Sequence, residues 1–256
     1  SSDVCSSDLG NQRIASDGNG GAIIVWQDSL NGNWDIYAQR INGNGVPQWT
    51  AGGVAVCTAT STQSNPRLVI DATGSAIIAW QDKRNGLDYD IYCQKLNGSG
   101  VPQWTANGIL VAGGANAQLN QKIALDGAGM SIIVYQNYQT GSFYDVFAQR
   151  INSAGALQWN ANGVLVCNAA GNQNAIDLTT ENISDGAIVT WKDARATNLN
   201  IYCQKVNLSG NVQWQNNGVL LSNPSGNHVN PSIVGDSAGG GIIVWGDSSS
   251  TTFNIY

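Results

Sequence analysis

The stretch DIYAQRINGNGVPQW at positions 35–49 returns as DIYCQKLNGSGVPQW at positions 90–104. Its first three residues, or a close variant of them, begin at positions 35, 90, 145, 200 and 254, so the spacings are 55, 55, 55 and 54 residues. Aromatic residues recur with nearly the same spacing at Trp26, Trp80, Tyr135, Trp191 and Trp245. A fixed period of this length indicates a repeat architecture in which each repeat is one supersecondary unit.

Each repeat contains four short runs with the composition of β-strands. In residues 66–120 these runs are PRLVID, SAIIAWQD, DIYCQKLN and GILVAG. They are rich in Ile, Val, Trp and Tyr and are bounded by Gly, Asn, Asp and Pro, which favours strands joined by turns. The second run is continuously apolar, which predicts a strand that is covered on both faces.

Four-stranded units of this length, packed between copies of themselves, are typical of the blades of a β-propeller. We therefore predict an all-β propeller with four-stranded antiparallel blades. The blades span residues 10–65, 66–120, 121–175, 176–230 and, as a partial fifth blade, 231–256, all in one propeller domain. Four full blades and part of a fifth do not close a ring by themselves, so the sequence predicts an open arc, with a strained five-blade ring as the alternative.

The first nine residues, SSDVCSSDL, do not belong to the repeat. They match the translation of a common sequencing adapter, and we predict that residues 1–9 take no part in the fold. The chain is then expected to be a fragment of a longer protein, and the remainder of that parent chain is missing.

The composition argues against two classes of partner. Charged residues make up 11% of the chain and the formal net charge is −6, without the basic patch of a nucleic-acid-binding protein. No apolar run approaches the length of a membrane-spanning helix, so membrane insertion is not expected. The 30 Asn and 31 Gly suit turns with positive φ and fit an extracellular bacterial repeat protein.

The segment WQDKRNGLDYDIYCQKLNGSGVPQW at residues 80–104 resembles repeats in large secreted bacterial surface proteins, many of which are exported by the type IX route. The resemblance covers about residues 11–256. It implies a secreted or cell-surface location, and it provides no known activity to transfer to this chain. The Arg of this pattern is present at Arg84 and Arg195, and the other repeats have Leu30, Gln139 and Ser249 in its place.

Each complete repeat also contains a turn with the pattern N-x-x-G-x-x-Q-W, which runs from Asn42 to Trp49 in the first repeat. It is similar to the Asp-box of sialidase-type propellers, S-x-D-x-G-x-x-W, although Gly45 falls one position early. A short polar side chain can accept backbone hydrogen bonds in such a turn while the Trp packs beneath it. Since Asp-boxes lie opposite the active site, we assign these turns a structural role.

The loop between the second and third strands of each repeat is flanked by polar residues. In the first two repeats these are Asp28 with Asp35 and Asp82 with Asp90. Paired carboxylates supply the oxygen ligands that Ca²⁺ prefers, so these four residues are weak calcium candidates, and no other metal or cofactor is expected. The alternative is that each Asp caps its own hairpin, which better explains why every repeat has Asp or Asn at these flanking positions.

Between these flanks the repeats differ, and variable loops on a repeated scaffold are where binding residues tend to lie. An aromatic ring beside Asp, Asn or Arg can stack on a sugar and bind its hydroxyl groups; the alternative is a hydrophobic lid over the rim. The candidate ligand-binding residues are Trp34, Asp35, Arg84, Tyr89, Asp90, Tyr144, Asp145 and Arg195.

Two residues that are each the only one of their type could serve acid–base catalysis. His228 lies in a connection and is expected to be exposed and solvated, without a Ser–His–Asp arrangement around it. Glu181 is the only candidate for the raised-pKa acid of a glycosidase, but we place it on the face away from the variable loops. No catalytic residue is therefore predicted.

The sequence thus predicts a non-catalytic extracellular propeller module that binds a glycan or a protein through its variable loops. Two alternatives stay open: a purely structural spacer or display module, and a sialidase- or glycosidase-like propeller enzyme. An enzyme should break the repeat symmetry, and the second repeat comes closest to doing so with Lys83, Arg84, Asp88 and Asp90.

The four cysteines beyond the first nine residues are predicted to be free thiols. Cys57 and Cys93 are 36 residues apart, as are Cys167 and Cys203, which suits disulfides between repeats. If Ala38 lies opposite Cys57 across the third and fourth strands, however, each Cys shares a sheet face with a small residue. Two such Cys in sheets about 10 Å apart cannot meet.

Overall fold

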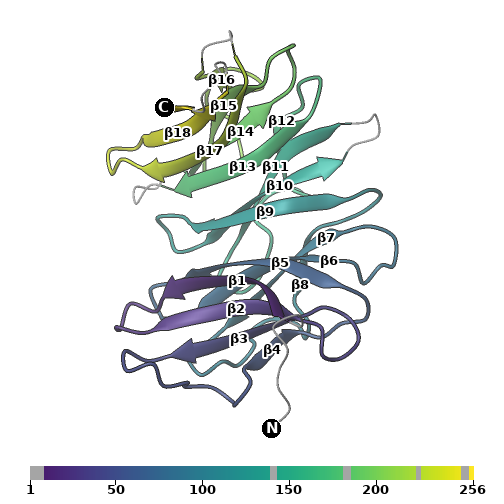
Figure 1. Ribbon diagram of the computed structural model, residues 1–256, viewed down its shortest axis with the longest axis vertical. Helices are drawn as coiled ribbons and strands as arrows, with labels where there is room; N and C mark the ends of the chain where they lie inside the picture. Colours follow the sequence, from purple (N-terminus) through teal and green to yellow (C-terminus); the bar gives the residue numbers. More distant parts are fainter. Residues whose placement is uncertain (1–8, 139–142, 181–185, 223–225, 249–253) are drawn as a thin grey trace. The chain divides into compact units, whose positions relative to one another are not determined.

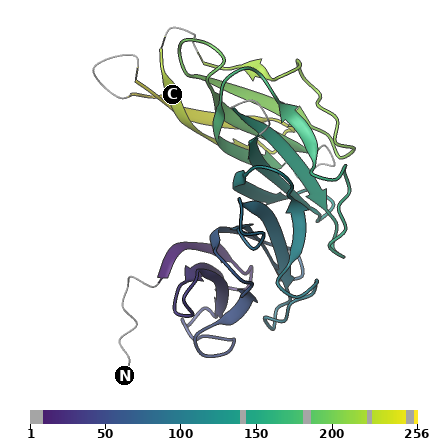
Figure 2. The same cartoon turned by 90° about the vertical axis from the view of Figure 1, so that its right-hand side faces the viewer.

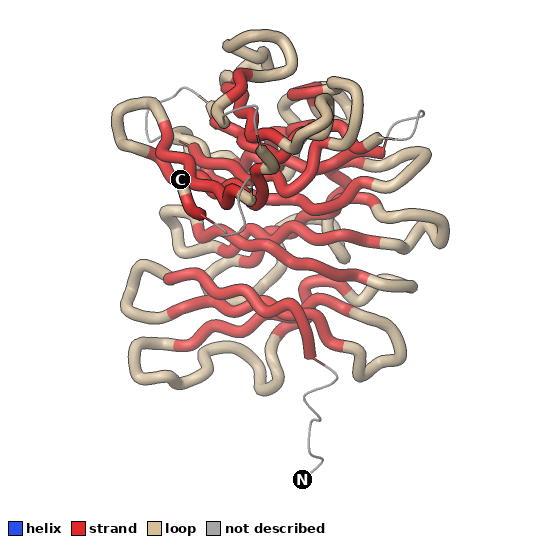
Figure 3. The backbone as a smooth tube through the Cα atoms, turned by 45° about the horizontal axis from the view of Figure 1, so that its top comes forward, coloured by secondary structure: helices blue, strands red, loops and turns tan. Residues whose placement is uncertain are grey.

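The computed structural model describes residues 9–138, 143–180, 186–222, 226–248 and 254–256. All regular structure in this part of the chain is β-strand, as Figure 3 shows, and the strands form five antiparallel sheets. Accordingly, the described residues contain no helix that could cross a membrane. The chain divides into two compact units, residues 1–115 and 116–256.

The first unit contains two four-stranded sheets in which each strand pairs with the next one along the chain (Figure 1). The first sheet consists of β1 (Leu9–Ser16), β2 (Ala22–Asp28), β3 (Asp35–Ile41) and β4 (Val54–Cys57). The second sheet consists of β5 (Gln63–Ile70), β6 (Ala76–Asp82), β7 (Asp90–Leu96) and β8 (Ile109–Ala112).

The second unit contains two more sheets of this kind and one three-stranded sheet, which Figure 2 shows from a second direction. The third sheet consists of β9 (Gln118–Leu125), β10 (Ser131–Tyr138), β11 (Tyr144–Ile151) and β12 (Val164–Cys167). The fourth consists of β13 (Gln173–Thr180), β14 (Ala187–Asp193), β15 (Asn200–Val206) and β16 (Val219–Leu220). The fifth consists of β17 (His228–Gly235), β18 (Gly241–Asp247) and β19 (Asn254–Ile255).

These sheets confirm the predicted all-β fold of antiparallel propeller blades, with a partial fifth blade. The first strands of the later blades begin three residues before the predicted boundaries, at Gln63, Gln118, Gln173 and His228. Leu9, which we expected to take no part in the fold, begins β1 and lies opposite Asp28; residues 1–8 lie outside the described residues. The open arc concerns the placement of the two units and stays a prediction.

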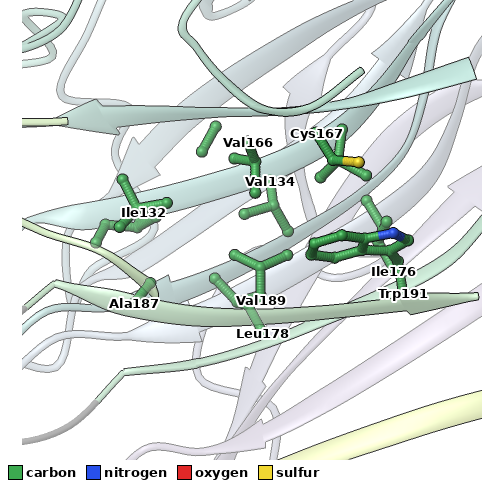
Figure 4. Close-up of a cluster of buried hydrophobic side chains, with 12 residues drawn as sticks. Ile132, Val134, Val166, Cys167, Ile176, Leu178, Ala187, Val189 and Trp191 are labelled. Carbon is green, nitrogen blue, oxygen red and sulfur yellow. The ribbon is translucent and has the colours of Figure 1, made fainter. Parts of the chain in front are cut away.

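The core of each unit forms where apolar faces of two neighbouring sheets meet. In the first unit, Ile23 and Val25 of β2 belong to one cluster with Ile78 and Trp80 of β6. In the second unit, the equivalent positions of β10 and β14 form the cluster shown in Figure 4. Alternate residues of a strand point to one face, so the pattern of each strand directs a fixed set of side chains into this core.

Burial along the second strand differs between blades. Every residue of β6 is buried, and β10 is buried from Ser131 to Asn137, which confirms the predicted coverage of both faces for these strands. In β2, buried residues alternate with partly exposed ones, and β18 exposes alternate residues, so the prediction is wrong there. The reason in β2 is that the face of Ile23 and Val25 joins the core, whereas Trp26 on the other face stays partly exposed.

The N-x-x-G-x-x-Q-W turns have the structural role predicted for them. Asn42 Oδ1 accepts hydrogen bonds from the backbone N–H groups of Asn44 and Val46, both at 3.0 Å. The Trp49 indole packs against the core, and its Nε1 donates to the Gly98 carbonyl oxygen of the next blade at 3.1 Å. The same Asn bonds recur in the turns that begin at Asn97, Asn152 and Asn207.

The four cysteines are buried free thiols, as predicted. The expected register is wrong, because a bulge between Ile36 and Tyr37 places Cys57 opposite Ile36 and Ala38 opposite Val54. Cys57 nevertheless lies in the same core cluster as Ile36 and Ala38. Burial raises the pKa of Cys57 to about 12, so the thiol stays protonated at neutral pH.

Replacing Asn152 with Ala is expected to lower the free energy of unfolding by about 1–2 kcal/mol, because two backbone N–H groups lose their acceptor. Urea denaturation measures this loss. Asn152→Asp keeps an acceptor oxygen and is the matched control, with an expected loss below about 0.5 kcal/mol. Equal losses in the two variants would show that the side-chain acceptor does not stabilise the turn.

Candidate functional site

The loops between second and third strands begin and end at residues that face each other across the sheet. Asp28 lies opposite Asp35, and Asp82 lies opposite Asp90. The structure distributes the candidate residues over both units. The first unit holds Trp34, Asp35, Arg84, Tyr89 and Asp90, and the second holds Tyr144, Asp145 and Arg195.

Arg84 and Asp82 form an ion pair at the end of β6. The Arg84 Nε donates to Asp82 Oδ1 at 2.9 Å, and Nη2 donates to Oδ2 at 2.6 Å. The Trp80 Nε1 donates to Oδ2 as well, at 2.8 Å, and Asp82 is 0% exposed. Bidentate, charge-assisted hydrogen bonds of this kind are among the stronger ones in proteins.

The Arg84 guanidinium makes two further contacts within its blade. It lies 3.8 Å from the centroid of the Tyr92 ring, and Nη2 donates to the Asn107 carbonyl oxygen at 2.8 Å. The second unit repeats these contacts with Arg195, Asp193, Tyr202 and Asn217. Both arginines are therefore engaged inside the protein. The sequence contained a signal for these ion pairs, because each arginine stands two residues after the Asp that it binds.

Asp35 begins β3 and is 3% exposed. Burial raises the pKa of its carboxyl, while hydrogen bonds from the side chains of Asn31 and Asn33 oppose this rise. The preceding Trp34 is partly buried, and its carbonyl oxygen accepts the Gln63 N–H at 2.7 Å. The two candidates are thus held against the first strand of the next blade.

Asp90 begins β7 and is 6% exposed. Burial raises the pKa of its carboxyl to about 6, the negative charge of Asp88 adds to the rise, and the Gly114 N–H only partly offsets it. Asn85 Nδ2 donates to Oδ2 at 3.2 Å, whereas Oδ1 has no hydrogen bond of ordinary geometry within the described residues. The preceding Tyr89 is partly buried.

In the second unit, Asp145 lies opposite Asn137 and is partly buried. Burial raises the pKa of its carboxyl to about 6. The neighbouring Tyr144 donates its backbone N–H to Asn172 Oδ1 at 3.0 Å, and its ring lies 5.1 Å from that of Tyr138, centroid to centroid. The third blade thus holds an acid that resembles the one in the second blade.

The calcium candidates were Asp28, Asp35, Asp82 and Asp90. Asp28 Oδ1 accepts the Leu30 N–H at 2.8 Å, and Asp82 Oδ1 accepts the Arg84 N–H at 2.9 Å, which confirms the hairpin-cap interpretation for these two residues. Within the described part of the chain, no group of three or more His, Cys, Asp or Glu side chains is arranged to hold a metal ion. Calcium binding stays a prediction.

His228 is the first residue of β17 and is 3% exposed, so the prediction of a solvated loop histidine is wrong. Its backbone N–H donates to the Leu199 carbonyl oxygen at 2.8 Å, and its imidazole ring lies edge-on to the Trp245 ring. The Nε2 is 3.9 Å from Asp247 Oδ2. The cause is that β17 begins earlier than the sequence pattern indicated. The other candidate, Glu181, lies outside the described residues.

No family model matches the chain, and no curated protein matches it in sequence. Several solved structures share its fold at low identity. The endo-arabinase from Bacteroides thetaiotaomicron has a TM-score of 0.52 and 11% identity, with 96% of this chain and 92% of that chain covered. A thermostable family-43 glycoside hydrolase has a TM-score of 0.53 and 10% identity, with 97% and 88% covered. An ulvan lyase has a TM-score of 0.64 and 11% identity, with 96% and 63% covered.

The chain therefore has the propeller-like fold seen in glycoside hydrolases. This finding overturns the prediction that the module is non-catalytic and that the chain is not an enzyme, because the structures with its fold include enzymes that cleave carbohydrates. The prediction rested on the expectation that an enzyme shows an acid that breaks the repeat. In the structure, burial raises the pKa of three acids that share one repeat position, Asp35, Asp90 and Asp145.

Replacing Arg84 with Met is expected to lower the free energy of unfolding by about 3 kcal/mol, because Asp82 stays buried without its counter-charge. Chemical denaturation measures the change. Arg84→Lys keeps the positive charge but loses the bidentate geometry and the ring stacking, so its loss should be intermediate. Wild-type stability in Arg84→Met would mean that the ion pair does not hold this end of the blade.

The carboxyl of Asp90 should make the stability depend on pH. Its pKa is 3.8 in an ordinary environment and about 6 in the folded protein, so the folded state binds the proton more tightly. The free energy of unfolding is therefore expected to fall as pH rises from about 4 to about 6. Asp90→Asn should remove part of this decrease, and Asp145 accounts for another part. Urea denaturation at several pH values tests this, and an unchanged slope in Asp90→Asn contradicts it.

Proposed function

We propose that the chain is the propeller of a secreted enzyme that hydrolyses the glycosidic bonds of a polysaccharide. Two findings support the proposal: the similarity of its fold to an endo-arabinase and a family-43 glycoside hydrolase, and the buried carboxyl groups at the loop end of its blades. The single observation that carries it is the Asp90 carboxyl, which is 6% exposed and has a pKa of about 6.

Asp90 is the proton donor in this proposal. Glycosidases protonate the leaving oxygen with one carboxyl group while a second, ionised carboxylate acts as base or nucleophile. A carboxyl whose pKa is about 6 retains part of its protons near neutral pH, unlike an ordinary Asp.

Asp35 is the proposed carboxylate partner. Asn31 and Asn33 donate hydrogen bonds to its carboxylate, which favours the ionised form. Asp90 instead has the negative charge of Asp88 beside it, which favours the protonated form. Burial raises the pKa of both carboxyl groups, but two Asn donors oppose the rise at Asp35, whereas the charge of Asp88 adds to it at Asp90. This difference is why Asp90 is proposed as the acid and Asp35 as its partner.

The aromatic residues next to these acids are the proposed sugar-binding surface. Trp34 precedes Asp35 and Tyr89 precedes Asp90, and both residues are partly buried. Aromatic faces bind the apolar face of a sugar ring while neighbouring polar groups bind its hydroxyls. The partner is thus an extracellular glycan, and the resemblance to secreted bacterial repeat proteins supports export to the cell surface by the type IX route.

A second candidate reaction is cleavage by elimination. The observation that favours it is the TM-score of 0.64 with an ulvan lyase, although the chain spans only 63% of that enzyme's length. Hydrolysis and elimination leave different products, since elimination introduces a double bond that absorbs ultraviolet light. The same assay therefore separates the two reactions.

Asp90→Asn and Asp35→Asn are each expected to lower kcat by about 100-fold or more, since each removes one of the two carboxyl groups of the reaction. The assay measures reducing ends released from arabinan and from other plant and algal polysaccharides, together with ultraviolet absorbance. Circular dichroism checks that the variants stay folded.

Asp88→Asn is the matched control, because it leaves Asp90 in place and removes the nearby negative charge. Its activity should persist, with the alkaline limb of the pH profile displaced to lower pH as the pKa of Asp90 falls. Full activity in Asp90→Asn, or release of neither product from any polysaccharide, overturns the proposed function.

A further inference from the structure

Two blades hold an arginine side chain in a slot made of a carboxylate, two aromatic rings and a carbonyl oxygen. In the second blade, the Arg84 guanidinium binds Asp82 and stacks on Tyr92. It also donates to the Asn107 carbonyl oxygen, and Trp80 bonds to the same carboxylate through Nε1. In this slot the Asp82 carboxylate, the Trp80 indole N–H and the Asn107 carbonyl oxygen all have hydrogen-bond partners.

The first blade has a cavity at the corresponding place and no arginine. Leu30 stands at the position of Arg84 and is 61% exposed. A cavity of about 360 Å³ opens there, lined by Leu9, Trp26, Asp28, Leu30, Gln39, Pro47, Gly52 and Gly53. By repeat position, Trp26, Asp28 and Gly52 supply the indole, the carboxylate and the carbonyl oxygen.

The carboxylate of this cavity is held as in the filled slot. Asp28 Oδ1 accepts the Leu30 N–H at 2.8 Å, and the corresponding bond in the second blade, from the Arg84 N–H to Asp82 Oδ1, measures 2.9 Å. The two blades therefore present the carboxylate on the same backbone support. They differ in what lies next to the carboxylate, which is the Arg84 guanidinium in the second blade and the cavity in the first.

The aromatic part of the slot is also retained. Tyr37 stacks on Trp26 with 6.4 Å between ring centroids, the same separation as between Tyr92 and Trp80. Trp26 Nε1 is buried and has no hydrogen-bond partner within the described residues. A buried donor without an acceptor is unfavourable, and the filled slot removes this cost by bonding the indole to the carboxylate.

The third blade has closed its slot in another way. There the Tyr135 hydroxyl donates to the Asn162 carbonyl oxygen, which stands at the repeat position of Asn107. That oxygen is the acceptor that the guanidinium uses in the second blade. The third blade therefore lacks the open slot. The fifth blade has a smaller cavity of about 120 Å³, lined by His228, Trp245, Asp247 and Tyr256, and the Trp245 Nε1 likewise has no hydrogen-bond partner within the described residues.

We propose that the cavity of the first blade binds an alkylguanidinium group, the chemistry of an arginine side chain. The guanidinium forms two hydrogen bonds with Asp28, donates to the Gly52 carbonyl oxygen and lies beside the Trp26 ring, all of which line the cavity. Its apolar stem lies along Leu9 and Pro47. A planar guanidinium makes paired bonds to a carboxylate and stacks on a ring, which an ammonium group does not.

The experiment titrates n-propylguanidinium into the protein and follows the indole N–H signal of Trp26 by NMR, assigned with Trp26→Phe. A saturable shift is expected, because binding turns the Asp28 carboxylate toward the indole. n-Propylammonium carries the same charge and stem and should bind at least about tenfold more weakly. Neutral n-propylurea tests whether the cavity accepts any small apolar molecule.

Variants of two lining residues complete the test. Leu30→Arg supplies the guanidinium from the chain itself, so the Trp26 signal should be displaced without ligand and the titration should be lost, whereas Leu30→Lys should not displace it. Asp28→Asn should weaken binding at least about tenfold. Equal affinity for the ammonium or urea probe, unchanged binding in Asp28→Asn, or a titration that persists in Leu30→Arg overturns the proposal.

Discussion

The indole of Trp80 is the contact on which the rest of its blade depends. It is fully buried in the core between two sheets, and a Cβ atom added to Gly108 would lie 2.5 Å from its ring. Gly108 has a φ of 85°, a conformation that glycine adopts without strain, so the chain can pass closely under the ring into β8. The Nε1 of the same indole binds Asp82, which holds Arg84. One aromatic side chain thus joins the core, a turn and the charged end of the blade.

The packing of the sheets also determines the acid chemistry at the loop end. A carboxylate that loses water becomes more basic unless neighbouring donors or cations stabilise its charge. Asp82 has such partners in Arg84 and Trp80 and is fixed in place by them. Asp90, directly across the sheet, has one Asn donor and a second acid beside it, and its pKa rises to about 6. One scaffold therefore produces a fixed structural carboxylate and a carboxyl able to exchange its proton near neutral pH.

The blades differ at places where side chains of different chemistry occupy equivalent positions. Arg84 fills its slot with a guanidinium, the third blade uses the hydroxyl of Tyr135, and the first blade leaves a cavity beside Leu30. At the start of the first strand, His228 occupies the repeat position of Gln63 and remains buried. The backbone pairing is the same in each case, so the sheets tolerate these exchanges while the chemistry at their ends changes.

The period of the DIY motif and the turn residues around it determined the fold class, the strand order and the role of Asn42, because these act through local backbone geometry. The bulge beside Ile36, the pairing of Arg84 with Asp82, the burial of His228 and the raised pKa of Asp90 were decided by the tertiary structure. The link to carbohydrate-cleaving enzymes likewise came from the arrangement of the sheets. Desolvation and the distance between charges depend on neighbours from other strands and other blades, and a local sequence pattern does not contain those neighbours.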